Sequence, residues 1–148
     1  MAIRFARVVG VNVLGALYSS RAAARRMSVR TGGPGDGIVN LSFGAAGLGS
    51  PDTYVWYAAS KGAVESRTIG LSKELGPDGI RVNAVSPGYV DSDIHDVSGM
   101  RERVEREAPS LPLGRLGTTD EIAEAVLWLL SDAASYVTGT ILRVTGGR

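Results

Sequence analysis

Tyr57 and Lys61 are the two residues of this chain whose types and spacing could do chemistry together. On a helix, side chains four residues apart share one face, so a phenol and an ammonium at this spacing can serve one site. A phenol has an unperturbed pKa of about 10 and needs help to exchange protons near neutral pH. A neighbouring ammonium favours the phenolate, and we therefore expect Lys61 to lower the pKa of Tyr57. The pair predicts acid/base chemistry, although an isolated pair at this spacing is more often a core tyrosine beside a surface lysine.

Hydrophobic periodicity and turn residues predict the elements that must hold this pair. Apolar residues recur with helical spacing over residues 3–27 and 54–75, and the second helix should end at Gly76-Pro77, the usual order of helix-stopping residues. The sequence Thr-Thr-Asp-Glu at 118–121 matches a capping box, so a third helix should run from there to about residue 132. Short apolar runs predict strands at 37–42, 80–85 and 140–144.

Long helices between successive strands imply crossover connections, and such connections join parallel strands. The sequence therefore predicts an α/β fold, in which residues 1–148 form one domain with a parallel sheet covered by helices on both faces. Before the last helix, residues 91–113 should form a mobile helical flap whose charge run at 101–107 faces solvent.

Aromatic residues and the single histidine carry weaker expectations. We expect His95, in the flap, to be exposed to solvent, and Trp128 to be buried in a helix stripe. Tyr54 and Trp56 flank the candidate pair and should shape either a substrate entrance or a dimer contact.

Composition places the chain among ordinary globular proteins. It has 148 residues, of which 44% are hydrophobic and 21% charged, and its formal net charge is +1. This charge gives no reason to expect nucleic acid or an anionic membrane as a partner, and no apolar run is long enough to span a bilayer. With no cysteine, and no acidic pair at ligand spacing near His95, we expect no metal. Arg4, Arg7 and Asn12 interrupt any secretory signal, so we expect a cytoplasmic protein.

Several short motifs follow one another along nearly the whole chain. They are Val11-Asn12-Val13-Leu14-Gly15, the strand at 37–42, Tyr57-Ala58-Ala59-Ser60-Lys61, Arg81-Val82-Asn83-Ala84-Val85-Ser86-Pro87-Gly88, Thr138-Gly139 and Thr145-Gly146-Gly147. In this order they resemble the C-terminal half of the short-chain dehydrogenase/reductase family. The resemblance implies a partial Rossmann-like, doubly wound parallel sheet that retains about three C-terminal strands and their flanking helices.

The resemblance also implies catalytic roles. Tyr57 would be the acid/base that exchanges a proton with the substrate oxygen, and Lys61 would lower its pKa and hold the nicotinamide ribose. Asn12 would bind, through its helix backbone, a water of the proton relay. Taken alone, Asn12 is a polar residue beside a helix bend near Gly10 and Gly15.

A cofactor, NAD or NADP, and a small alcohol or carbonyl substrate are implied in the same way. Pro87, Gly88 and Val90 would line the nicotinamide, and Ser92 stands where the family often has threonine. Taken alone, Pro87-Gly88 is an ordinary turn.

The chain departs from the family at the end of the first predicted strand. Two consecutive serines are usual there, the second of which binds the substrate oxygen, whereas this chain has Ser42-Phe43. Successive strand residues point to opposite faces, so Ser42 reaches the catalytic position only through a bulge or twist. Ser42 remains the candidate, and Ser50 is a weaker substitute. Loss of such a donor costs on the order of 10²–10³ in rate in a well-studied hydrolase, so we expect poor activity.

A second departure is that the family's phosphate-binding turn, a glycine-rich connection from the first strand to the first helix, has no counterpart here. The chain could be an impaired oxidoreductase, a catalytically inactive relative serving as a structural or oligomerising module, or a fragment from a start codon assigned inside a longer reading frame. The strand at 38–42 would form an unprotected sheet edge. We therefore expect a homo-oligomer, formed through this edge or through the helices at 3–27 and 54–75.

Overall fold

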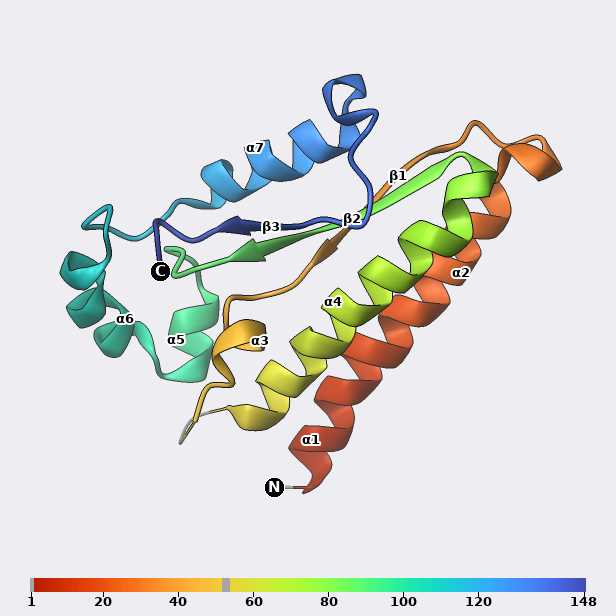
Figure 1. Ribbon diagram of the computed structural model, residues 1–148. Coiled ribbons are helices and arrows are strands. Elements are labelled where there is room, and N and C mark those ends of the chain that lie inside the picture. Colours follow the sequence, from red (N-terminus) through yellow and green to blue (C-terminus); the bar gives the residue numbers. More distant parts are fainter. Residues whose placement is uncertain (1, 52–53) are drawn as a thin grey trace.

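The computed structural model describes residues 2–51 and 54–148, and its centre is a parallel sheet of three strands (Figure 1). The strands are β1 (Asp36–Leu41), β2 (Ile80–Pro87) and β3 (Ile141–Val144), in the order β1-β2-β3. In the register of the sheet, Asn40 lies beside Ala84, and Ala84 lies beside Ile141. The predicted α/β fold with about three parallel strands is confirmed.

Long helices cover both faces of this sheet (Figure 1). On one face α4 (Val55–Leu75) packs on β2, and beside α4 lie α1 (Ala2–Val9), a π-helical turn (Gly10–Gly15) and α2 (Ala16–Met27). On the other face α7 (Thr119–Leu130) packs on β1 and β2. The short helices α3 (Ala45–Leu48), α5 (Ile94–Ser98) and α6 (Arg101–Glu107) lie toward the carboxyl ends of the strands (Figure 1).

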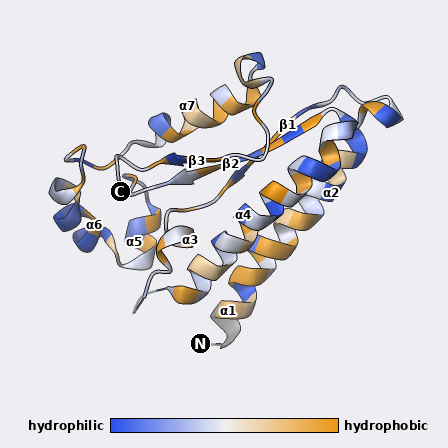
Figure 2. Cartoon of the chain, viewed as in Figure 1, coloured by the Kyte–Doolittle hydropathy of each residue, from blue (hydrophilic) through white to orange (hydrophobic). Residues whose placement is uncertain are grey.

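The core of the molecule is built around β2. Ile80, Val82, Ala84 and Val85 are all at most 1% exposed, and so is Leu129 of α7. These β-branched and small side chains suit a strand that is covered on both faces. By contrast, many large apolar side chains of α1, the π-helical turn, α2 and α4 are exposed, and Figure 2 shows the apolar colour along these helices.

Local sequence signals place the helix ends where they were predicted. Thr118 accepts a hydrogen bond from the Glu121 backbone N–H, and the Glu121 carboxylate accepts one from the Thr118 N–H, so the capping box at the start of α7 is confirmed. Helix α4 ends at Leu75, directly before Gly76-Pro77. No helix in the described part of the chain combines the length and the apolar character needed to cross a membrane.

The predicted helix over residues 3–27 is confirmed, and it contains a π-helical turn that the apolar pattern does not reveal. Two expectations about local structure are wrong. Trp128 is 44% exposed, because the neighbouring Leu129 faces the sheet and each step along a helix turns the side chain by about 100°. His95 is buried, because α5 places its ring edge-on against the ring of Tyr89, with the centroids 6.3 Å apart.

Candidate active site

Helix α4 carries Tyr57 and Lys61 one turn apart, and both side chains are half-buried. Ala58 and Ser60, which lie between them in sequence, are buried and hold this part of the helix against the rest of the fold. The Lys61 Nζ lies 5.6 Å from the centroid of the Tyr57 ring. The predicted pair is therefore a spatial pair, with the ammonium beside the phenol ring.

The end of β1 closes around this pair. Lys61 Nζ donates a hydrogen bond of 2.9 Å to the Leu41 carbonyl. Phe43, two residues further, presents its ring to Tyr57 with the centroids 5.8 Å apart and an angle of 61° between the planes. The position that faces the candidate acid/base thus holds an apolar ring instead of a hydroxyl.

Ser42 faces the other way. Its buried hydroxyl donates a 2.7 Å hydrogen bond to Glu65 Oε1 of α4, one turn beyond Lys61. This agrees with the alternation of side chains along a strand, which separates the directions of residues 42 and 43. The Ser50 backbone carbonyl accepts a hydrogen bond from the Tyr54 N–H, and the described contacts do not bring either serine to the Tyr57 phenol.

Asn12 is tied to the same helix through a residue that the sequence analysis did not single out. Its Nδ2 donates to Ser60 Oγ at 3.1 Å, and that hydroxyl donates to the Tyr57 carbonyl at 2.7 Å. Asn12 lies in the π-helical turn, a distortion that occurs frequently at functional sites. Gly10 and Gly15 at the ends of this turn were the only sequence signal for it.

The predicted nicotinamide-lining residues lie where β2 ends. The Pro87 carbonyl accepts from the Gly44 N–H at 2.9 Å, which ties this end of β2 to the residue after Phe43. A Cβ on Gly88 would come within 2.8 Å of the Thr145 backbone, so glycine is required there. Val90 bridges to Gly117, and the Ser92 hydroxyl donates to the Val90 carbonyl at 3.4 Å. In open α/β sheets, ligands bind outside this carboxyl edge.

Burial governs the protonation of the pair. It raises the pKa of the Tyr57 phenol and lowers the pKa of the Lys61 ammonium, because both charged forms lose solvation. The direction of the Tyr57 pKa is therefore set by burial and is opposite to the one expected from the neighbouring ammonium. The buried phenol is consequently held in its neutral, proton-donating form.

The flap, residues 91–113, is held by contacts on both sides of the candidate site, the first of them beside Gly88. The Tyr89 hydroxyl donates to Glu107 of α6 at 2.7 Å, and the Arg148 guanidinium lies 3.8 Å from the Tyr89 ring centroid. Tyr54, at the start of α4, donates to the Ser98 carbonyl of α5 at 3.2 Å and meets Trp56 edge-on. The flap is therefore fastened at both the β2 end and the α4 end of the candidate site.

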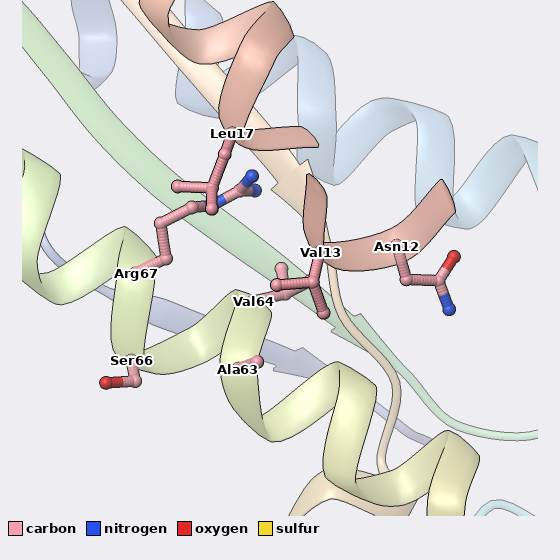
Figure 3. Close-up of a pocket in the computed structure, with 7 residues that line it drawn as sticks. All are labelled: Asn12, Val13, Leu17, Ala63, Val64, Ser66 and Arg67. Atoms are coloured by element: carbon pink, nitrogen blue, oxygen red, sulfur yellow. The ribbon is translucent and has the colours of Figure 1, made fainter. Parts of the chain in front are cut away.

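A pocket with a volume of 280 Å³ lies between the π-helical turn, the start of α2, and α4. Figure 3 shows the residues that line it. Its walls are mainly apolar and include Val13, Leu17 and Val64. Of the candidate catalytic residues, Asn12 lines it, whereas Tyr57 and Lys61 do not. Among the described residues, no three His, Asp or Glu side chains gather in a way that could hold a metal ion.

Comparison with known proteins identifies this arrangement. The family model described as Enoyl-(Acyl carrier protein) reductase matches residues 2–148. The chain belongs to the short-chain dehydrogenase/reductase family. It is 47% identical over 145 residues to the uncharacterized oxidoreductase YgfF of Escherichia coli (strain K12), covering 98% of this chain and 59% of that protein. It is 46% identical over 145 residues to the galactitol 2-dehydrogenase (L-tagatose-forming) of Cereibacter sphaeroides, covering 95% of this chain and 55% of that one.

Solved structures of this family agree. The 3-ketoacyl-(acyl-carrier-protein) reductase from Brucella melitensis, complexed with NADH, matches with a TM-score of 0.89 and 36% identity. The match covers 100% of this chain and 59% of that one, so this short-chain dehydrogenase/reductase spans little more than half the length of the relatives it matches. It corresponds to their C-terminal half, as the motif order predicted.

The residues present fit the nicotinamide end of such a cofactor. The Lys61 ammonium has donors beyond the one bonded to Leu41, and the closely packed Gly88 backbone lies between the ends of β2 and β3. In the described part, no long helix starts from a glycine-rich turn at a strand end, the arrangement that holds a pyrophosphate in Rossmann-type folds.

Proposed function

We infer that residues 1–148 form a single domain carrying the catalytic half of a nicotinamide-dependent oxidoreductase, which acts on a small alcohol or carbonyl compound. The observation that carries this proposal is the Tyr57–Lys61 pair on one face of α4, closed in by the end of β1. The relatives include proteins named as dehydrogenases, and solved neighbours are complexes with NADH and with NADPH. The cofactor is accordingly NAD or NADP.

In the reductive direction, Tyr57 acts as the general acid. The raised pKa keeps its phenol protonated, so that Oη can give a proton to the substrate's carbonyl oxygen. When bound, the nicotinamide supplies the hydride. Lys61 binds the nicotinamide ribose, and Asn12 holds the relay water through its backbone in the π-helical turn. Pro87, Gly88, Val90 and Ser92 form the wall against the nicotinamide.

We expect the reaction to be impaired. Phe43 offers no hydrogen bond to a developing oxyanion, and Ser42 is bonded to Glu65. The affinity for dinucleotide should also be weak, since the described residues hold no pyrophosphate cradle.

The second candidate function is that of a catalytically inactive, oligomerising relative in the cytoplasm. The apolar ring against Tyr57 favours it, as do the exposed apolar side chains of the helices. Phe5, Leu14, Leu17 and Tyr18 are between 41% and 67% exposed. A homo-oligomer that pairs the 3–27 and 54–75 helices of two copies would cover them.

Titration with NADH, followed by nicotinamide fluorescence, tests the first function. We expect a weak, saturable change, together with slow carbonyl reduction that is lost in Tyr57→Phe while the fluorescence change persists. No fluorescence change at millimolar NADH would exclude it and leave the inactive relative. Light scattering separately tests the oligomer, which a monodisperse monomer would exclude.

A further inference from the structure

One basic residue of α4, Arg67, has its guanidinium directed into the molecule. The buried side chains of this helix recur at Val64, Thr68 and Ser72, and Arg67 lies beside that row. Its Nη2 donates a 2.7 Å hydrogen bond to Asn40 Oδ1 of β1. The positive charge of Arg67 is therefore held between α4 and the sheet.

This guanidinium lacks a neutralising partner. Its Nε and Nη1 atoms are buried without a hydrogen-bond acceptor in the described part of the chain, and no described carboxylate forms an ion pair with it. Burial lowers the pKa of Arg67 because the charged form loses solvation, yet an arginine does not give up its proton in proteins. A buried cation without a partner is destabilising, and an anion that reaches it offsets the loss of solvation.

The pocket of Figure 3 adjoins this charge. Arg67 lines it from α4, and its side chain extends toward Leu17 of α2. Val13 and Val64 lie in the middle of the pocket, between Arg67 and Asn12 (Figure 3). A mainly apolar space with a cation at one end is complementary to an acid that carries an apolar tail.

We propose that this pocket binds a small aliphatic carboxylate, with the carboxylate at Arg67 and the tail against Val13 and Val64. The carboxylate oxygens supply acceptors for the unpaired N–H groups, and such charge-assisted hydrogen bonds are about twice as strong as neutral ones. The tail is removed from water by the apolar walls. Because the two nitrogen atoms are covered, the carboxylate reaches them as the side chain of Leu17, which is 41% exposed, moves aside.

The size and charge of the pocket select this class of ligand. Its volume of 280 Å³ lies just below the range of roughly 300–1,000 Å³ for pockets that hold one small molecule, which leaves room for a short chain and not for a folded surface. A phosphate would bring about two negative charges into apolar surroundings that offer one cation. Tyr57 and Lys61 do not line the pocket, so its occupancy requires no dinucleotide.

Isothermal titration calorimetry of the intact chain with octanoate tests the proposal. The matched control is 1-octanol, which keeps the tail and lacks the charge. We expect saturable binding of octanoate and at least about tenfold weaker binding of 1-octanol, since hydrogen bonds to a charged group are lost. Nuclear magnetic resonance follows the Arg67 Nε–H directly, and its signal should shift as octanoate binds.

Three variants locate the binding. Arg67→Met removes the cation and keeps an unbranched side chain, whereas Val13→Trp fills the pocket and keeps the cation. We expect each to weaken octanoate binding at least about tenfold. Lys73→Leu removes an exposed positive charge from the same helix and should leave the affinity unchanged. Octanoate should raise the melting temperature of the wild type and of Lys73→Leu, and not that of Arg67→Met. Circular dichroism checks that each variant folds.

Four outcomes would overturn the proposal: no saturable binding of octanoate, equal affinity for 1-octanol, unchanged affinity in both folded pocket variants, or an equal loss of affinity in Lys73→Leu. Light scattering adds one more. A dimer that Arg67→Met abolishes and that octanoate leaves intact would assign the partner of this cation to a second copy, and this too would overturn it.

Discussion

β1 and β2 are neighbours in one sheet, yet they have opposite surroundings. β2 is buried at nearly every position, with side chains covered from both faces, whereas no residue of β1 is fully buried. The candidate site gathers at the end of the exposed strand, around Leu41 and Phe43. The buried body of β2 thus provides stability, whereas the candidate site gathers at the carboxyl ends of β1 and β2, and substitutions should separate the two.

The largest effect on stability should come from the layer packed on β2. Leu129→Ala leaves a cavity at a fully buried position and should lower the free energy of unfolding by about 2–5 kcal/mol. Leu127→Ala, on the same helix but 58% exposed, should cost less than about 1 kcal/mol. Urea denaturation of both variants measures the difference. Equal losses would show that α7 does not pack as described.

Asn83 and Asn40 offer the same comparison for polar groups. Asn83 of β2 is buried, donates to the Val137 carbonyl and accepts the Thr140 N–H. Asn83→Ala leaves both partners unpaired and should cost about 1–3 kcal/mol. Asn40→Ala on β1 removes the hydrogen bonds of a half-buried side chain with Thr68 and Arg67, and its loss of stability should be about 1 kcal/mol smaller than that of Asn83→Ala. A larger loss at Asn40, measured by the same denaturation, would place the stability in β1.

Phe43→Ser tests the chemical side of the comparison. A hydroxyl in place of the ring that meets Tyr57 should raise carbonyl reduction about tenfold, below the full contribution of a preorganised oxyanion donor. Phe43→Ala is the control, because it removes the ring without adding a donor. Steady-state rates with NADH measure both, and equal rates for the two variants would rule out a role for the hydroxyl.

The smallest expected effect is a change in pH dependence. Because burial raises the pKa of Tyr57, the folded chain holds this proton more tightly than the unfolded chain. The resulting stability is complete below about pH 9 and is lost as the pH rises through the folded pKa. Tyr57→Phe cannot ionise, so its stability relative to the wild type should improve above about pH 10. Parallel stability curves across this range would contradict the raised pKa.

Patterns carried by neighbouring residues predicted much of the fold. The parallel strands, the Thr118 capping box and the end of α4 at Gly76-Pro77 follow from local chemistry, and the motif order identified the family. The opposite directions of Ser42 and Phe43 followed from strand alternation.

Features that depend on contacts between distant segments could not be predicted. The burial of His95 is set by Tyr89, and the exposure of Trp128 by the face of α7 that meets the sheet. The direction of the Tyr57 pKa depends on burial, which is not visible in the spacing of the pair.

The bond from Lys61 to Leu41 makes one ammonium a member of two sites. The same carbonyl belongs to the open edge of β1, and the same ammonium lies beside the Tyr57 ring. A ligand that draws the ammonium away therefore removes a hydrogen bond from the end of β1. Thermodynamic linkage makes this coupling reciprocal, so any change that strengthens the bond between Lys61 and Leu41 should weaken a ligand that needs the ammonium, by the same free energy.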